Sequence, residues 1–142
     1  MWTIVVVTNP AVTVHRPARL TPHARRGLAP KAPGIRPSMV QAGTYSATLH
    51  YLKTAEAMGV AQAKVSGAAT VAKMKTIPTD DDCFGQGSIR VDGRVLHPSY
   101  LWEVKTPAES KGPWDYYKLV ASTPGEEAFR PLADGHCPIV KA

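Results

Sequence analysis

The chain has 142 residues and a formal net charge of +6 at neutral pH, a length that suits one domain with a modest hydrophobic core. No stretch approaches the ~20 apolar residues of a membrane-spanning helix. The two cysteines are far apart in the sequence, which excludes a zinc site built on a Cys-x-x-Cys pair.

The positive charge is concentrated at the N-terminus. Residues 1–37 hold six of the 17 Lys and Arg residues and no acidic residue, and the first acid in the chain is Glu56. Residues 38–142 carry 11 basic and 11 acidic side chains, so this part is neutral. The basic pI is therefore a property of a leader, residues 1–37, and is not by itself a reason to expect a nucleic-acid partner.

The leader also contains six of the 13 prolines, which interrupt helices and strands. We expect residues 11–37 to be disordered and residues 38–142 to form the organised domain. Residues 1–7 are apolar, but no Lys or Arg precedes them and Asn9-Pro10 follows. A short strand or a mistranslated segment is therefore favoured over a signal peptide, and without one the chain as written would stay in the cytoplasm.

Two helices are predicted at the start of the domain. Residues 44–58 have helical periodicity, and Gly59 suits the position after the helix end. The apolar stripe of this helix consists of Tyr45, Leu49, Leu52 and Ala55. In the alanine-rich stretch 60–75, Ser66 is a suitable N-cap for a second helix that ends before Pro78.

A β-hairpin is predicted next. Segments 88–91 and 94–97 flank Asp92-Gly93, a dipeptide typical of a two-residue type I′ turn. A turn of this length places Ile89 opposite Leu96, with both side chains directed to the core.

Two further strands and a short helix complete the chain. Strands are expected at 100–105 and at 114–122. The sequence Thr123-Pro-Gly-Glu126 is that of a capping box, so a helix over 126–132 should follow, and then a terminal loop over 135–138. The order of elements predicts an α/β fold whose apolar helix faces need a larger sheet than these few strands provide.

No segment forms a convincing catalytic or metal-binding motif. We considered a calcium loop, a ligating histidine, a phosphate loop, a base-stacking cluster and a thiol nucleophile. The residues concerned are Asp80-Asp81-Asp82; His50; Gly85-Gln-Gly87; Trp114, Tyr116, Tyr117 and Lys118; and His136-Cys137. A solvated turn, a core or surface histidine, a buried or interface aromatic cluster, and a disulfide or inert thiol are the favoured interpretations. No enzyme activity, metal or cofactor is predicted.

The two cysteines leave two alternatives open. In an oxidising compartment Cys83 and Cys137 could form a disulfide. It would close a loop of roughly 55 residues, worth about 4 kcal/mol in the chain-entropy model. Otherwise both remain unpaired thiols.

Six segments in order share the pattern of one family. They are Met39–Lys53, Val71–Lys75, Ile89–Arg94, Tyr100–Lys105, Glu109–Val120 and Glu127–Leu132, followed by Cys137-Pro138. Together they resemble the C-terminal part of type I periplasmic substrate-binding proteins of the branched-chain amino acid ABC transporter family, the leucine/isoleucine/valine-binding type. The run 109–120 followed by 127–132 is the most specific part of this likeness.

The resemblance implies a fold of two α/β lobes joined by three crossing strands, with the ligand bound in the cleft between them. The matched part would supply a helix pair of one lobe and a strand near the hinge. The implied function is that of a truncated solute-binding component, with an amino acid or small amide as ligand and an ABC permease as membrane partner, in the periplasm.

The family's contacts to the ligand lie mainly in the part that precedes the match, so ligand-binding residues stay unknown. A disulfide between Cys83 and Cys137 would fit the family.

A second hypothesis assigns function to the leader. Residues 11–37 would bind nucleic acid or an anionic surface through Arg and Lys side chains. Such binding would be sensitive to salt and would vanish when residues 1–37 are deleted, whereas the solute-binding hypothesis expects no nucleic-acid partner.

Made alone, the chain is expected to be marginally stable and to self-associate through exposed helix faces. Burying a side chain such as Leu49 or Leu52 contributes ~1.5–3 kcal/mol, against a domain stability of ~5–15 kcal/mol. Sedimentation velocity should therefore show association that grows with concentration. A sharp, reversible unfolding transition that is independent of concentration would contradict this prediction.

Overall fold

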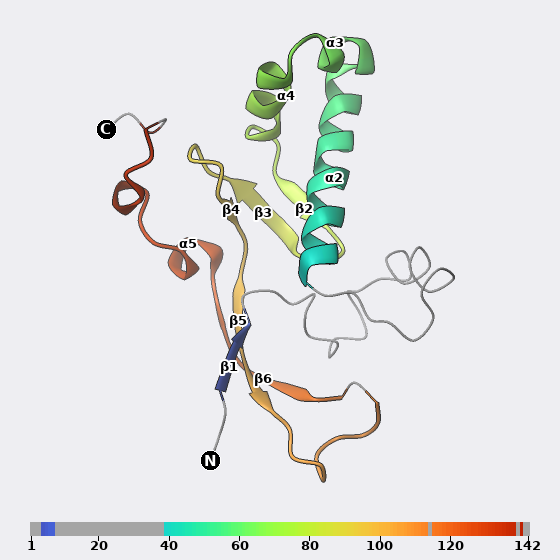
Figure 1. The fold of residues 1–142 in the computed structure, drawn as a ribbon, viewed down its shortest axis with the longest axis vertical. Coiled ribbons are helices and arrows are strands. Elements are labelled where there is room, and N and C mark those ends of the chain that lie inside the picture. The colour runs from blue at the N-terminus through green and yellow to red at the C-terminus, as the bar shows by residue number, and fades with distance from the viewer. Residues whose placement is uncertain (1–3, 8–38, 114, 139, 141–142) are drawn as a thin grey trace.

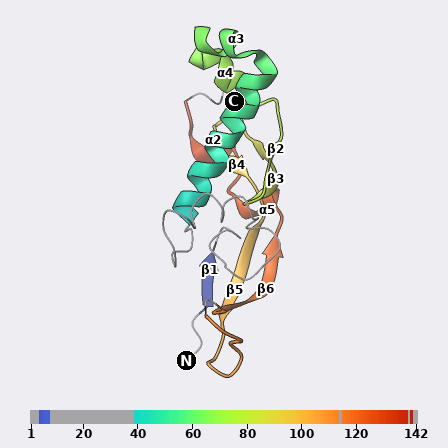
Figure 2. The same ribbon diagram turned by 90° about the vertical axis from the view of Figure 1, so that its right-hand side faces the viewer.

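The computed structural model describes residues 4–7, 39–113, 115–138 and 140. The segment predicted to be disordered, 11–37, lies outside these ranges. The described elements form two groups at opposite ends of an elongated molecule, one of helices with a small sheet and one of a second sheet alone (Figure 1). The view at right angles shows the same separation (Figure 2).

The helical group contains α2 (Met39–Met58), α3 (Val60–Val65) and α4 (Gly67–Met74). Both predicted helices are confirmed, although α2 begins at Met39 rather than Thr44 and a separate short helix, α3, precedes the second one. Ser66 is the N-cap of α4, as predicted, and its Oγ accepts a hydrogen bond from the N–H of Ala69 at 3.2 Å.

The face of α2 that packs against α4 is small and polar. Thr54 is fully buried and its hydroxyl donates to the carbonyl of His50 at 2.8 Å. His50 is 5% exposed, and its Nε2 lies 3.0 Å from the carbonyl oxygen of Met74 at the end of α4. His50 is therefore a core histidine that joins the two helices, one of the interpretations favoured from the sequence.

The predicted apolar stripe of α2 is only partly covered. Ala55 is buried, Tyr45 and Leu49 are half-buried, and Leu52 is 56% exposed. In the part of the chain that the structure describes, the elements that pack most closely on α2 are its helical neighbours and the short strand β2 (Thr79–Asp81), rather than a large sheet. This arrangement matches the expectation that the helix faces need more sheet than the chain has.

The small sheet has the order β2-β3-β4, with β3 at Gly85–Ile89 and β4 at Val95–Leu96. Ile89 pairs with Val95, so the predicted pairing of Ile89 with Leu96 is wrong by one residue. The loop has three residues rather than two, because the N–H of Arg90 donates to the carbonyl of Arg94 at 2.8 Å. Gly93 adopts φ 85°, the left-handed conformation that a three-residue hairpin loop requires.

The second sheet has the order β1-β5-β6, with β1 at Ile4–Val7, β5 at Ser99–Val104 and β6 at Tyr117–Thr123. All pairs are antiparallel, and the ladder is irregular between Leu101 and Trp102. The strands expected at 100–105 and 114–122 are confirmed with shifted ends. The alternative of a short strand at the start of the chain is confirmed as well, and this strand joins the domain's own sheet.

The predicted capping box is wrong. Thr123 is the last residue of β6, where it pairs with Ser99, and α5 (Gly125–Ala128) has Pro124 as its N-cap without a side-chain hydrogen bond. The helix lasts one turn, and Phe129 after it is extended. A second short helical turn, η1 (Ala133–Gly135), follows. The sequence had predicted one helix over 126–132 and then only a loop.

Candidate functional site

A groove of about 440 Å³ lies between α2, α4 and the β3–β4 hairpin. Its lining is mostly apolar and consists of Gly43, Ser46, Ala47, His50, Val71, Met74, Lys75, Thr79, Phe84, Ile89, Gly93, Val95 and His97. Among the described residues, no carboxylate lines it, and its one lysine, Lys75, donates to the carbonyl of Val91 at 2.7 Å. A zwitterionic amino acid needs partners for both its charges, so this groove is not suited to hold one.

Asp81 connects α2 to the turn between β2 and β3. Its Oδ1 accepts hydrogen bonds from the N–H groups of Cys83 at 2.7 Å and Phe84 at 2.8 Å, and its Oδ2 accepts one from the hydroxyl of Ser46. The interpretation of residues 80–82 as a merely solvated turn is therefore wrong for Asp81, although Asp80 is exposed. The described residues contain no group of three acidic, His or Cys side chains that could hold a metal ion.

Both cysteines are free thiols in the structure, and their pairing in an oxidising compartment stays a prediction. Cys83 is 5% exposed and packs with Ala42, Tyr45 and Phe84. Burial, and then the charges of the neighbouring carboxylates, raise the pKa of Cys83 from 9.0 to about 11. Its thiol therefore stays protonated at neutral pH and is a poor nucleophile.

The two thiols are expected to react at very different rates. At pH 8 a thiol with a pKa near 11 is about one-thousandth thiolate, and Cys83 is also buried, whereas Cys137 is partly exposed. Titration with an aromatic disulfide reagent should give one fast and one slow phase, and Cys83→Ser should remove only the slow phase. In denaturant the phases should merge, and equal rates in the native protein would contradict the structure.

The loop after β5 is held by a buried ion pair. Lys105 Nζ lies 2.6 Å from Asp115 Oδ1, and both side chains are largely buried. The second carboxylate oxygen of Asp115 accepts from the N–H of Lys111 at 2.7 Å. Asp115 therefore fixes both arms of the loop, which explains how a charged residue is tolerated next to β6.

A second charged group holds the same loop at the surface. Lys118 Nζ lies 2.9 Å from Glu109 and 3.2 Å from Glu103, and Glu109 also accepts from the N–H of Thr106 at 2.8 Å. Because Lys118 is bound to two carboxylates, it is not free to bind the phosphate backbone of a nucleic acid. The ring of Tyr116 contacts the ring of Tyr117 edge to face. Tyr116 is 48% exposed, so the prediction of a buried aromatic cluster is wrong for Tyr116, and Trp114 lies outside the described residues.

This surface group predicts a pH dependence of stability. Hydrogen bonds from Lys118, and then from Thr106, lower the pKa of Glu109 from 4.5 to about 2. Its stabilising contribution is therefore complete above pH 4.5 and is lost as the pH falls towards 2. Glu109→Gln should lower the urea midpoint near neutral pH, and the difference from the parent protein should shrink below pH 4.5. Glu127→Gln, at an exposed position, is the control that should show no such trend.

The remaining residues singled out from the sequence have structural positions. Gly85 and Gly87 lie in β3, and a Cβ on Gly87 would be 2.5 Å from the carbonyl oxygen of Leu96, so glycine is required by strand packing rather than by phosphate binding. His136 has φ 45° and is exposed. Among the described residues, no helix is both long and apolar enough to cross a membrane.

Comparison with known proteins identifies the chain's relatives. The family described as periplasmic binding protein matches residues 19–113, a range that begins inside the segment 1–37. The structure of a periplasmic binding protein from Burkholderia mallei is 35% identical, covers 99% of this chain and superposes with a TM-score of 0.81.

A second solved structure, of a branched chain amino acid ABC transporter periplasmic ligand-binding protein from Burkholderia xenovorans LB400, is 38% identical over 80% of this chain, with a TM-score of 0.68. No curated protein matched the chain.

The chain spans about a third of the length of these relatives, 35% of the first and 29% of the second. The family match covers most of the described domain, and the structural match extends over nearly all of the chain. The predicted family resemblance and the predicted partial lobe are thereby confirmed, and the chain belongs to the periplasmic binding protein family.

Proposed function

We propose that this chain is part of the solute-binding component of an ABC importer for branched-chain amino acids or related amides, acting in the periplasm. The observation that supports this most strongly is its likeness to the Burkholderia xenovorans ligand-binding protein of a branched chain amino acid ABC transporter. The function requires no catalytic step. A ligand is captured between two lobes and passed to a membrane permease.

The described residues favour a supporting role within that protein over direct ligand contact. The groove beside α2 has no carboxylate, and its lysine is already bonded to a backbone carbonyl. The acidic side chains Asp81 and Asp115 are occupied by hydrogen bonds that hold turns together. We therefore propose that the charged groups of the ligand are bound by parts of the family fold outside the third that this chain spans.

Equilibrium dialysis tests the proposal with labelled leucine, isoleucine, valine and acetamide, and with glutamate as a control ligand. The samples are the 142-residue chain and a fusion of this chain to the part of the Burkholderia xenovorans protein that it does not match. The fusion should bind a branched-chain amino acid or the amide saturably, and the chain alone should bind none of them. A fusion that folds, as judged by circular dichroism, but binds no amino acid or amide would overturn the proposal.

A further inference from the structure

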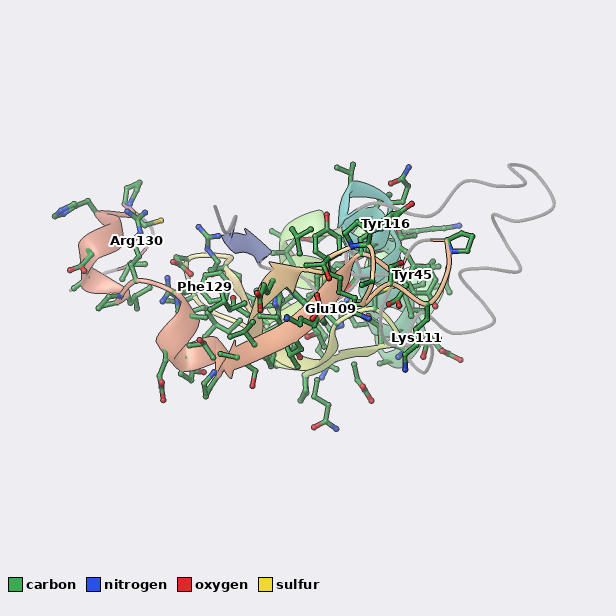
Figure 3. All side chains as sticks on the ribbon, turned by 90° about the horizontal axis from the view of Figure 1, so that it is seen from below. Tyr45, Glu109, Lys111, Tyr116, Phe129 and Arg130 are labelled. Carbon is green, nitrogen blue, oxygen red and sulfur yellow. The ribbon has the colours of Figure 1, made fainter. Side chains whose placement is uncertain are left out.

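A second groove, of about 770 Å³, lies between the β3–β4 loop and the segment that follows α5. It lies away from the loop after β5 that Asp115 and Glu109 hold. Figure 3 shows Phe129 and Arg130 at a distance from Lys111 in that loop and from Tyr45 on α2. Neither the sequence motifs nor the proposed function assigns a role to this groove. Its walls carry two arginines, Arg94 and Arg130, and two histidines, His97 and His136.

Specific contacts hold the two walls of this groove together. Arg90 Nη1 donates to the carbonyl of Arg130 at 3.0 Å, across the two segments. The ring of His97 meets the ring of Phe129 at right angles, with centroids 5.8 Å apart. A Cβ on Gly125 would lie 2.9 Å from the backbone nitrogen of His97, so α5 approaches the strand as closely as glycine allows. The groove is therefore a built feature of the fold.

The charge of the groove is not balanced. Its one carboxylate, Asp92, already accepts hydrogen bonds from Arg90 at 2.6 and 3.0 Å and from the N–H of Arg94 at 3.1 Å. The bond from Arg90 lowers the pKa of Asp92 to about 2, so its charge is permanent and is compensated by Arg90. In the part of the chain that the structure describes, no carboxylate lies within ion-pair distance of the guanidinium of Arg94 or Arg130.

The two guanidinium groups come from the two walls of the groove. Arg94 Cζ lies 5.4 Å from the centroid of the Phe129 ring, a cation–π contact that restricts the side chain. Arg130 lies on the segment after α5, and its side chain is exposed to solvent. A guanidinium offers a planar pair of donors that suits oxyanions, and a flat carboxylate is satisfied by one such pair. Two pairs from opposite walls suit the tetrahedral oxygens of a phosphate.

We infer that this groove is a binding site for a phosphate group, with the guanidinium groups of Arg94 and Arg130 as the donors. His97 and His136 line the same space, and the Nδ1 of His97 lies 3.1 Å from the carbonyl oxygen of Pro98. This groove shares Gly93, Val95 and His97 with the groove beside α2, but neither arginine lines the groove beside α2.

Equilibrium dialysis with labelled inorganic phosphate tests the site on the full 142-residue chain, with chloride added to equal ionic strength in all samples. The expected result is saturable binding of about one phosphate per chain. The double variant Arg94→Gln/Arg130→Gln should weaken this binding by about tenfold or more, because it removes both charged donors. Arg94→Lys should fall between the two, since lysine keeps the charge but not the paired donors.

The matched control is Lys64→Gln/Lys73→Gln, which removes the same charge from exposed positions on α3 and α4. It should bind phosphate as the parent chain does. Equal loss in the control and in the arginine double variant, or the absence of saturable binding by the parent chain, would overturn the inference. All four substituted residues are exposed, so circular dichroism should show each variant folded like the parent.

Discussion

Replacing Trp102 by alanine is expected to lower the free energy of unfolding by about 3–5 kcal/mol, the usual range for deleting a large aromatic side chain from a core. Trp102 is 4% exposed and lies in the middle of β5, the strand that pairs with both β1 and β6. A loss of this size approaches the whole stability of a marginal domain. The variant should therefore show no cooperative urea transition when it is followed by far-UV circular dichroism.

Trp102→Phe separates packing from hydrogen bonding at the same position. The indole Nε1 of Trp102 is buried and has no hydrogen-bond partner among the described residues, a situation that costs about 1–3 kcal/mol. Phenylalanine removes the unpaired N–H and keeps most of the ring, so this variant should lose much less stability than Trp102→Ala. Val120→Ala, at a position of β6 that is 55% exposed and is not opposite Trp102, is the surface control. Equal losses in the Phe and Ala variants would show that the ring is not packed as the structure has it.

Local sequence patterns predicted the elements that depend on local physics. The period of α2, the serine cap of α4 and the apolar runs of β1 and β5 were all visible in the chain itself. Each of these depends on residues within a few positions of one another. The family resemblance added the arrangement, because two helices, a hairpin and strands do not by themselves specify which sheet covers which helix.

Errors arose where a side chain decides between two local structures. Asp92-Gly93 fits a two-residue turn, but Asp92 binds Arg90 and the N–H of Arg94, and these bonds stabilise the longer loop that shifts the register by one residue. Thr123 fits a helix cap, but its backbone is already used in the β6 ladder opposite Ser99. The bonds of Asp92 are local to the loop, whereas the partner of Thr123 is on another strand, which a pattern of spacing cannot reveal.

The site residues were the hardest to predict. Three strands, β4 to β6, and the helix α5 separate Arg94 from Arg130, and only the fold brings them to one groove. Asp81 had a local signal that was not used, because an aspartate before a tight turn often accepts from the N–H groups two and three residues later. The bond from Ser46 depends on tertiary packing and left no trace in the sequence.

Asp81→Ala is expected to lower the free energy of unfolding by about 2–3 kcal/mol, since hydrogen bonds to a charged acceptor contribute about 1.5–3 kcal/mol each and are not additive. The variant leaves the N–H groups of Cys83 and Phe84 without their acceptor and breaks the link from Ser46 on α2 to the β2–β3 turn. Urea unfolding followed by circular dichroism measures the loss.

The neighbouring residue supplies the control for Asp81. Asp80 is exposed, and only its backbone carbonyl is used, by Lys53 at 2.7 Å, so Asp80→Ala should change the stability little. A double-mutant cycle with Ser46→Ala should give a positive coupling energy to Asp81 and none to Asp80. Because Cys83 sits in the turn that Asp81 fixes, its reaction with the thiol reagent should also accelerate in Asp81→Ala. If Asp80→Ala and Asp81→Ala prove equally stable, the connection between α2 and the small sheet must be made by other contacts.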